Sequence, residues 1–179
     1  IRTKRRREHV NAHAAPGGEP RQRERGAARG IHPCGGAGRS GHAHRGELQK
    51  LERCRADAAL VRQFELPTAQ TLFHSVVVHF ENDVPIQVED RYVNPAVAPD
   101  YLTQDFASQT PNAYLMRVAP LQGVQFAIEA SMPGAEMAEM LRMEASEPCL
   151  VLRRSTRSQS QVASVSALWH PASRYRFTG

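Results

Sequence analysis

Three polar residues alternate along one predicted strand. Gln87, Glu89 and Arg91 occupy every second position of a segment rich in β-branched residues. Side chains two residues apart on a strand point to the same side, so these three share one surface. A guanidinium binds a carboxylate through two parallel N–H donors, and Glu89 together with His79 of the preceding strand could bind a polar or cationic ring. This chemistry is typical of a pocket for a small organic acid.

The register of the hairpin decides whether His79 joins the other polar residues. A two-residue loop at Asn82 and Asp83 would place His79 opposite Ile86, whereas a three-residue loop would place it opposite Gln87. In the second register Val77 faces Glu89 and Ser75 faces Arg91. That register alone would gather on one surface His79, Gln87, Glu89 and Arg91.

A solvated sheet face with a simple Glu89–Arg91 ion pair explains the same alternation. Three further residues are single candidates for a ligand site. Glu129 lies on a predicted strand, where an inward carboxylate needs a partner. Trp169 and Tyr114 could contact a ligand, but residues of these types more often pack in a core. The sequence leaves these alternatives open.

Motifs for catalysis, cofactors or metals are not found. The glycines at 35–38 follow no predicted strand, and Glu89 and Asp90 are adjacent on a strand and point to opposite faces. His42 and His44 are not accompanied by other ligands at zinc-like spacing. We therefore expect no enzyme, no cofactor and no metal site.

Composition divides the chain near residue 40. Residues 1–40 hold ten Lys/Arg against three acidic residues and no aromatic residue, whereas residues 41–179 hold thirteen Lys/Arg against fifteen acidic residues. The first segment is predicted to be a disordered, solvated tail or a non-specific nucleic-acid arm. No apolar run approaches the length of about 18 residues that a membrane span needs. Three cysteines without a CxxC motif favour a reduced, cytoplasmic setting.

The remaining residues, 41–179, predict one α+β domain with a mostly antiparallel sheet and a few packed helices. Thr110 and Pro111 fit an N-cap followed by proline at the first helical position. The predicted helices cover 56–64, 110–118 and 133–143. The predicted strands cover 44–51, 71–81, 85–94, 121–131, 149–157, 162–170 and, as a short last strand, 174–177.

Four runs carry a resemblance to a known family. They are LFHSVVVHFENDVPIQVEDRYVNP at 72–95, TPNAYLM at 110–116, EPCLVLRR at 147–154 and LWHPASRYRF at 168–177. The segment 41–179 resembles the effector domain, called UTRA, of HutC-type histidine-utilisation repressors in the GntR family. The resemblance implies a chorismate-lyase-like fold that binds a small metabolite and changes the spacing of DNA-binding heads in a homodimer.

For this branch the resemblance implies urocanate, an imidazole joined to an acrylate, as the effector. Arg91 would pair with its carboxylate, and Glu89 and His79 would contact its ring. In sugar-phosphate-sensing relatives arginines stand at the positions of Val77 and His79, so a phosphorylated effector is not expected here. Asn112 occupies the place of a ligand-binding serine.

The family's winged helix-turn-helix domain is not recognisable in residues 1–40. We therefore expect this chain to sense a metabolite without reading an operator, as a truncated or frame-disrupted product or as part of a longer protein. The alternative is an enzyme of chorismate-lyase type that acts on a small carboxylate.

Overall fold

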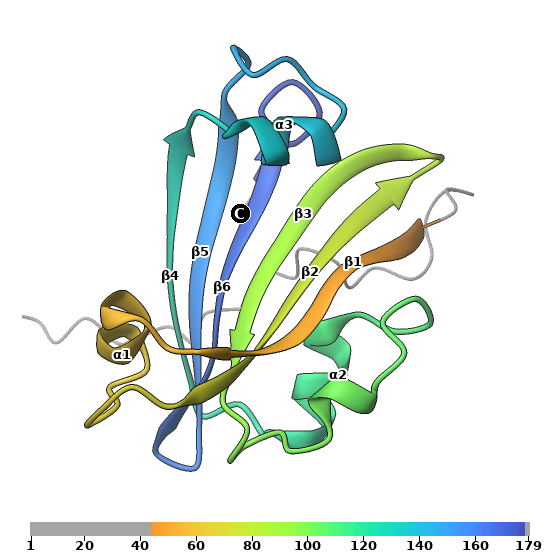
Figure 1. Ribbon diagram of the computed structural model, residues 1–179. Helices are drawn as coiled ribbons and strands as arrows, with labels where there is room; N and C mark the ends of the chain where they lie inside the picture. The colour runs from red at the N-terminus through yellow and green to blue at the C-terminus, as the bar shows by residue number, and fades with distance from the viewer. Residues whose placement is uncertain (1–43, 178–179) are drawn as a thin grey trace, which may run out of the picture. The chain divides into compact units, whose positions relative to one another are not determined.

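The computed structural model describes residues 44–177, which form an antiparallel sheet with short helices on both faces (Figure 1). The six strands follow the spatial order β1-β2-β3-β6-β5-β4, so β1 and β4 are the two edges. The predicted α+β class is confirmed. The strands are β1 His44–Arg55, β2 Thr71–Glu81, β3 Val84–Val93, β4 Gly123–Ser131, β5 Cys149–Ser158 and β6 Gln161–Pro171. The helices are α1 Ala58–Gln63, the 3-10 helix η1 Tyr101–Thr103, α2 Pro111–Val118 and α3 Ala135–Met140.

Local sequence signals set several of these boundaries. Thr110 caps α2 by accepting a hydrogen bond from the Ala113 N–H, and Pro111 takes the first helical position, as predicted. The strand predicted over 44–51 extends to Arg55, because its second half pairs with β2. The helix predicted over 133–143 is confined to Ala135–Met140.

The strand predicted over 174–177 is wrong. These residues follow β6 as irregular chain, and side-chain contacts rather than a strand ladder bind them to the domain. Arg174 donates to the backbone oxygens of Pro85 and Leu141 through Nη1 at 3.0 and 2.7 Å. Tyr175 stacks on His170 with ring centroids 3.9 Å apart.

The β2–β3 hairpin reaches its register through a bulge. Asn82 and Asp83 form a two-residue turn with φ of 49° and 63°, the positive values that short hairpin turns require. The ladder shifts by one residue at Ile86, so His79 pairs with Gln87. Neither loop length considered from sequence describes this hairpin, because the loop has two residues but the pairing is the one expected for three.

The sheet has two unlike faces. The α2 face carries Val77 and Val93, which pack against Tyr101, Tyr114 and Leu115 of the segment that leads through α2. The α1/α3 face carries Val76, Val78 and Val88, which pack around Leu141, and further along carries Leu72, which packs against α1. Alternation along β2 and β3 therefore decides which residues meet α2.

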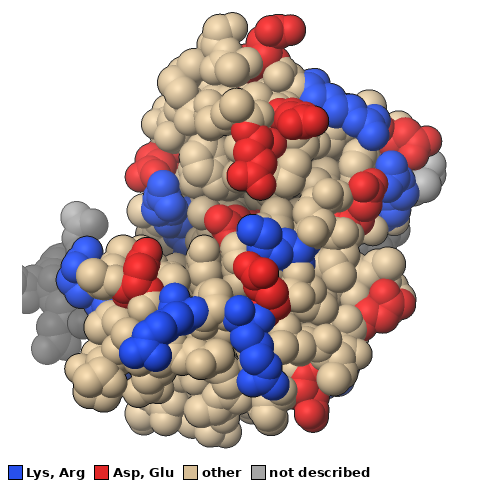
Figure 2. Space-filling view, viewed as in Figure 1, with Lys and Arg blue, Asp and Glu red and all other residues tan. Residues whose placement is uncertain are grey.

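The predicted tail at 1–40 lies outside the described residues. Within 44–177, no helix is long and apolar enough to cross a bilayer. On the face shown in Figure 2, acidic and basic side chains are interspersed rather than gathered by sign.

Candidate functional site

A buried polar cluster occupies the α2 face, where β2 and β3 pair. His79, Gln87, Glu89 and Arg91 are each 3% exposed or less. The interpretation as a solvated sheet face is therefore wrong. The bulge at Ile86 keeps Gln87 on the same face as Glu89 and Arg91, opposite His79.

Glu89 links the basic members of this cluster. Its Oε1 accepts a hydrogen bond from Arg91 Nε at 2.6 Å, and its Oε2 lies 3.4 Å from His79 Nε2. Burial by itself would raise the pKa of Glu89, but the guanidinium of Arg91 and the imidazole of His79 outweigh this and lower it from 4.5 to about 2. Glu89 is therefore an anion at neutral pH.

The cluster has hydrogen-bonding capacity left over. Arg91 Nη1 donates to Ser164 Oγ at 2.8 Å, but Arg91 Nη2 and His79 Nδ1 have no hydrogen-bond partner among the described residues. A buried polar atom without a partner costs roughly 1–3 kcal/mol, and more when it is charged. Two such atoms on one face indicate a site that a polar ligand would complete.

Two small cavities flank the cluster on the α2 face. His79 lines a cavity of about 90 Å³ between the start of β1 and residues 106–110. Arg91 and Asn112 line a second one of about 20 Å³ beneath α2. Gly46 permits the close approach at the first cavity, since a Cβ there would lie 3.1 Å from the Phe106 oxygen.

Three polar residues that the sequence analysis did not select lie beside this cluster: Arg154, Ser164 and Ser166. Ser166 pairs with Arg91 across β3 and β6 and with Arg154 across β6 and β5, so Arg91, Ser166 and Arg154 form one row across the sheet. Arg154 Nη2 donates a short hydrogen bond to Asn112 Oδ1. The alternation of Ser164 and Ser166 along β6 was a usable signal, but the placement of Arg154 depends on pairing between strands that are distant in sequence.

The other predicted site residues are not brought to the cluster. Tyr114 lies on the α2 face but packs in the aromatic core, with ring centroids 5.9 Å from Tyr101. Glu129 lies at the exposed β4 edge and pairs with Arg153 at 2.6 Å. Trp169 pairs with Val88 on the α1/α3 face and packs around the core beneath α3.

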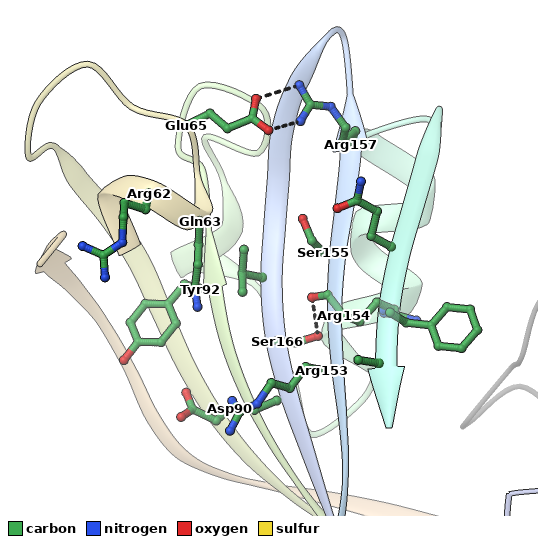
Figure 3. Close-up of a pocket in the computed structure, with 15 residues that line it drawn as sticks. Arg62, Gln63, Glu65, Asp90, Tyr92, Arg153, Arg154, Ser155, Arg157 and Ser166 are labelled. Atoms are coloured by element: carbon green, nitrogen blue, oxygen red, sulfur yellow. Dashed lines mark hydrogen bonds and ion pairs between the residues drawn. The ribbon is translucent and has the colours of Figure 1, made fainter. Parts of the chain in front are cut away.

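A larger hollow of about 550 Å³ lies on the α1/α3 face, between α1 and the strands β3 to β6 (Figure 3). Several of its charged side chains form ion pairs. Arg157 forms two hydrogen bonds with Glu65, at 2.7 and 3.0 Å, and Arg153 pairs with Glu129. This hollow is larger than the cavities near Arg91, but the side chains of these two ion pairs are 36% to 62% exposed, so water can complete their hydrogen bonds.

Among residues 44–177, no group of three or more His, Cys, Asp or Glu is arranged to hold a metal ion. The cysteines Cys54 and Cys149 are both free thiols. The cluster itself offers a carboxylate, a guanidinium and an imidazole as its chemical groups.

A comparison with protein families matches residues 39–176 to the UTRA domain. The chain belongs to the UTRA domain family. Histidine utilization repressors are among its relatives: that of Pseudomonas putida is 45% identical over 139 residues, which are 78% of this chain and 56% of the relative. That of Klebsiella aerogenes is 44% identical over 138 residues, 77% of this chain and 57% of the relative. The chain spans about half the length of these relatives.

Two solved structures resemble this chain. The C-terminal domain of histidine utilization repressor from Pseudomonas syringae pv. tomato is 44% identical, with a TM-score of 0.74 over 76% of this chain and 97% of that domain. The effector domain of PhnF from Mycobacterium smegmatis is 16% identical, with a TM-score of 0.71 over 77% of this chain and 86% of that domain, and it shows the shared fold alone. The relatives that are 44–45% identical are named as repressors, which agrees with the expectation that this domain is not an enzyme.

Proposed function

We propose that residues 41–179 form the effector-sensing domain of a transcriptional repressor of histidine utilisation, and that its effector is urocanate. The observation that carries this proposal is the pair of unsatisfied buried atoms, Arg91 Nη2 and His79 Nδ1, on the α2 face. The names of the 44–45% identical relatives support the biological setting.

The carboxylate of urocanate would bind at Arg91. The guanidinium already uses Nε for Glu89 and Nη1 for Ser164, which fixes its plane and leaves Nη2 to donate to the ligand. A donor held in this way loses little side-chain entropy when the ligand binds. Asn112 and its partner Arg154 lie at the same cavity or beside it and would add polar contacts.

The imidazole of urocanate would bind between His79 and Glu89. His79 Nδ1 can donate to or accept from a ring nitrogen, according to its tautomer. Glu89 is anionic at neutral pH and would accept a ring N–H or stabilise a protonated ring. The two ends of the ligand would thus bind at Arg91 and at His79 with Glu89.

Transmission to DNA would take place in a cytoplasmic homodimer. Ligand binding at α2 would shift the relative placement of two domains and, in a longer protein, the spacing of their DNA-binding heads. A ligand can shift the equilibrium between two arrangements of the dimer only by the difference in its affinity for them.

Isothermal titration calorimetry of the 179-residue chain against urocanate, histidine and a sugar phosphate tests the effector. We expect urocanate to bind and the sugar phosphate not to bind. At a ligand concentration of about 100 times Kd, urocanate should add about 2.7 kcal/mol to the free energy of unfolding. An intact fold without urocanate binding would refute the effector, and turnover of chorismate would instead support the enzyme alternative.

A matched pair of variants tests the role of Arg91. Arg91→Lys retains the charge but loses the planar fork, and should weaken urocanate at least tenfold. The control is Arg153→Lys, because Arg153 has the same 2.6 Å Nε contact with a glutamate but lies on the exposed opposite face. Equal affinity in both variants, with native circular dichroism, would remove Arg91 from the site.

A further inference from the structure

Two buried hydroxyl groups lie beside Arg91 on the α2 face. Ser75 of β2 is the cross-strand partner of Arg91, and Tyr101 of η1 packs against the same face of the sheet. Both residues are 0% exposed, and Ser75 Oγ lies 2.7 Å from Tyr101 Oη. Neither hydroxyl takes part in the hydrogen bonds that Arg91 makes with Glu89 and Ser164. The two hydroxyls therefore form a separate polar group next to the guanidinium.

One hydroxyl hydrogen of this pair has no acceptor. Serine and tyrosine each carry one O–H hydrogen, and the hydrogen bond between Ser75 and Tyr101 uses only one of the two. Neither side chain makes another hydrogen bond within residues 44–177. Because buried polar groups are nearly always fully bonded, the remaining hydrogen indicates an acceptor that the described side chains do not supply.

The hydroxyl pair on the other side of Arg91 is complete. Ser164 Oγ of β6 accepts a hydrogen bond from Arg91 Nη1 and lies 2.8 Å from Thr156 Oγ1. Thr156 Oγ1 can donate to the backbone oxygen of Ser164 at 3.4 Å, which leaves Ser164 free to donate its own hydrogen to Thr156. Of the two hydroxyl pairs that flank Arg91, only Ser75 and Tyr101 retain an unused donor.

Aromatic packing fixes the position of the Tyr101 hydroxyl. The centroid of the Tyr101 ring lies 4.8 Å from that of Phe106 and 5.9 Å from that of Tyr114. Burial raises the pKa of Tyr101, while the guanidinium of Arg91 opposes this rise and the carboxylate of Glu89 adds to it. The hydroxyl is therefore a neutral donor at physiological pH, and it is close enough to both charged groups to interact with them.

A carboxylate matches the two unused donors beside Ser75. Arg91 Nη2 has no partner among the described residues, and the hydroxyl pair supplies a second, neutral donor. Glu89 does not fill this role, because its oxygens already face Arg91 and His79. The carboxylate of a ligand has two equivalent oxygens and can accept from both donors at once. A methyl ester has no charge and only one good acceptor oxygen, so it would leave a buried donor unsatisfied.

We infer that Ser75 and Tyr101 determine the specificity of the effector site for a free carboxylate. Their unused O–H donates to one carboxylate oxygen, and Arg91 Nη2 donates to the other. The inference rests on the proposed function, since it takes Arg91 as the carboxylate contact, and it adds two residues that the sequence analysis did not select as ligand contacts. A site with fixed donors for one chemical group rejects analogues that cannot satisfy those donors.

Isothermal titration calorimetry of the full chain against urocanate and its methyl ester tests the hydroxyl pair. The double variant Ser75→Ala/Tyr101→Phe removes both hydroxyls, so neither is left as an unsatisfied partner and the fold should be retained. We expect the ratio of urocanate affinity to ester affinity to fall about tenfold or more, because the charge-assisted hydrogen bond is made only with the acid. A purely structural role would weaken both ligands equally and leave the ratio unchanged.

Tyr114→Phe is the matched control. It removes the same atom from a neighbouring ring in the same aromatic core, and should leave the affinity ratio within about twofold of the parent chain. If the double variant does not fold, Tyr101→Phe alone is the test variant. Ser75 then retains one hydroxyl, so the ratio should fall by a smaller factor. An unchanged ratio in a folded test variant that still binds urocanate would overturn the inference and leave the proposed effector intact.

Failure of the effector itself would give a different pattern. If the parent chain does not bind urocanate, the same ratio is measured for imidazolepropionate, a second imidazole acid, and its methyl ester. A fall of that ratio in the double variant would support the role of Ser75 and Tyr101 with a different effector. No binding of either acid by the parent chain would overturn both the effector and this inference.

Discussion

Two arginine–glutamate pairs in this domain have the same contact geometry and opposite surroundings. Arg91 Nε lies 2.6 Å from Glu89 Oε1, and Arg153 Nε lies 2.6 Å from Glu129 Oε1. The side chains of the first pair are 0% and 4% exposed, whereas those of the second are 51% and 46% exposed. The same contact is thus fully desolvated on the α2 face and hydrated on the α1/α3 face.

This difference teaches that burial, rather than contact distance or cavity size, separates a candidate site from ordinary surface. Water satisfies whatever hydrogen bonds the exposed pair does not make, and such pairs contribute about 0–1 kcal/mol. The buried pair has no access to water, so its remaining polar atoms can form hydrogen bonds only with neighbouring side chains or with a ligand. The larger hollow near Arg153 carries less functional information for this reason.

Removing one arginine from each pair should give the largest contrast. Arg91→Ala leaves the Glu89 carboxylate buried without its main partner, and should lower the free energy of unfolding by about 3–5 kcal/mol. Arg153→Ala should change it by less than about 1 kcal/mol. Urea denaturation of both variants measures the difference in the free energy of unfolding. Similar unfolding midpoints would show that water reaches the Glu89–Arg91 pair despite its low exposed fraction.

The pH dependence of stability should distinguish the two glutamates. The pKa of Glu89 is lowered from 4.5 to about 2 in the folded chain, so its contribution is fully present above pH 4.5 and is lost as the pH falls through about 2. The parent chain and Glu129→Gln should therefore lose stability steeply over this range. Glu89→Gln should show a shallower decline in thermal melts, and parallel curves for the two variants would contradict the assignment.

His170 should add a smaller effect at milder pH. Its ring stacks on Tyr175, and burial lowers its pKa from 6.5 to about 4. The unfolded chain binds this proton first, so the contribution is complete above pH 6.5 and is lost as the pH falls through about 4. His170→Phe should remove part of the decline in Tm across this interval, and an unchanged slope would assign the decline to other groups.

Tyr114→Phe should give the smallest change. The ring packs 5.9 Å from Tyr101 and 6.4 Å from Phe106, and phenylalanine preserves this packing. We expect urocanate affinity within about twofold of the parent chain and a stability change below about 1.5 kcal/mol. A large loss of affinity in calorimetry would move Tyr114 from the core to the ligand site.

Local patterns accounted for most of the fold. The valine-rich run ending at Glu81 was a strand, and Thr110 with Pro111 began a helix, because these signals depend on neighbouring residues alone. Alternation also grouped Glu89 with Arg91 correctly. The strand expected at 174–177 was wrong, since the side chains of Arg174 and Tyr175 bind this segment without a ladder.

Long-range pairing limited the prediction of the site. Arg154 reaches Asn112 only because β5 lies next to β6 in the sheet, and no local pattern reports that neighbour. The neighbouring strands of Trp169 and Glu129 were likewise not predictable from local sequence. Their residue types suggested a ligand contact, but their pairing places them on the α1/α3 face. Sheet order, rather than residue type, decided these positions.

The extra residue at Ile86 makes the hairpin unequally tolerant of changes in chain length. Deleting Ile86 would straighten β3 and still leave Gln87 across from His79, so Glu89 and Arg91 would keep their orientation. Deleting Val88 would instead shift the pairing on one side of the deletion by one residue, and the side chains there would change from one face of the sheet to the other. Homologous hairpins of differing length can therefore preserve the same binding chemistry only when the gain or loss occurs at this kink.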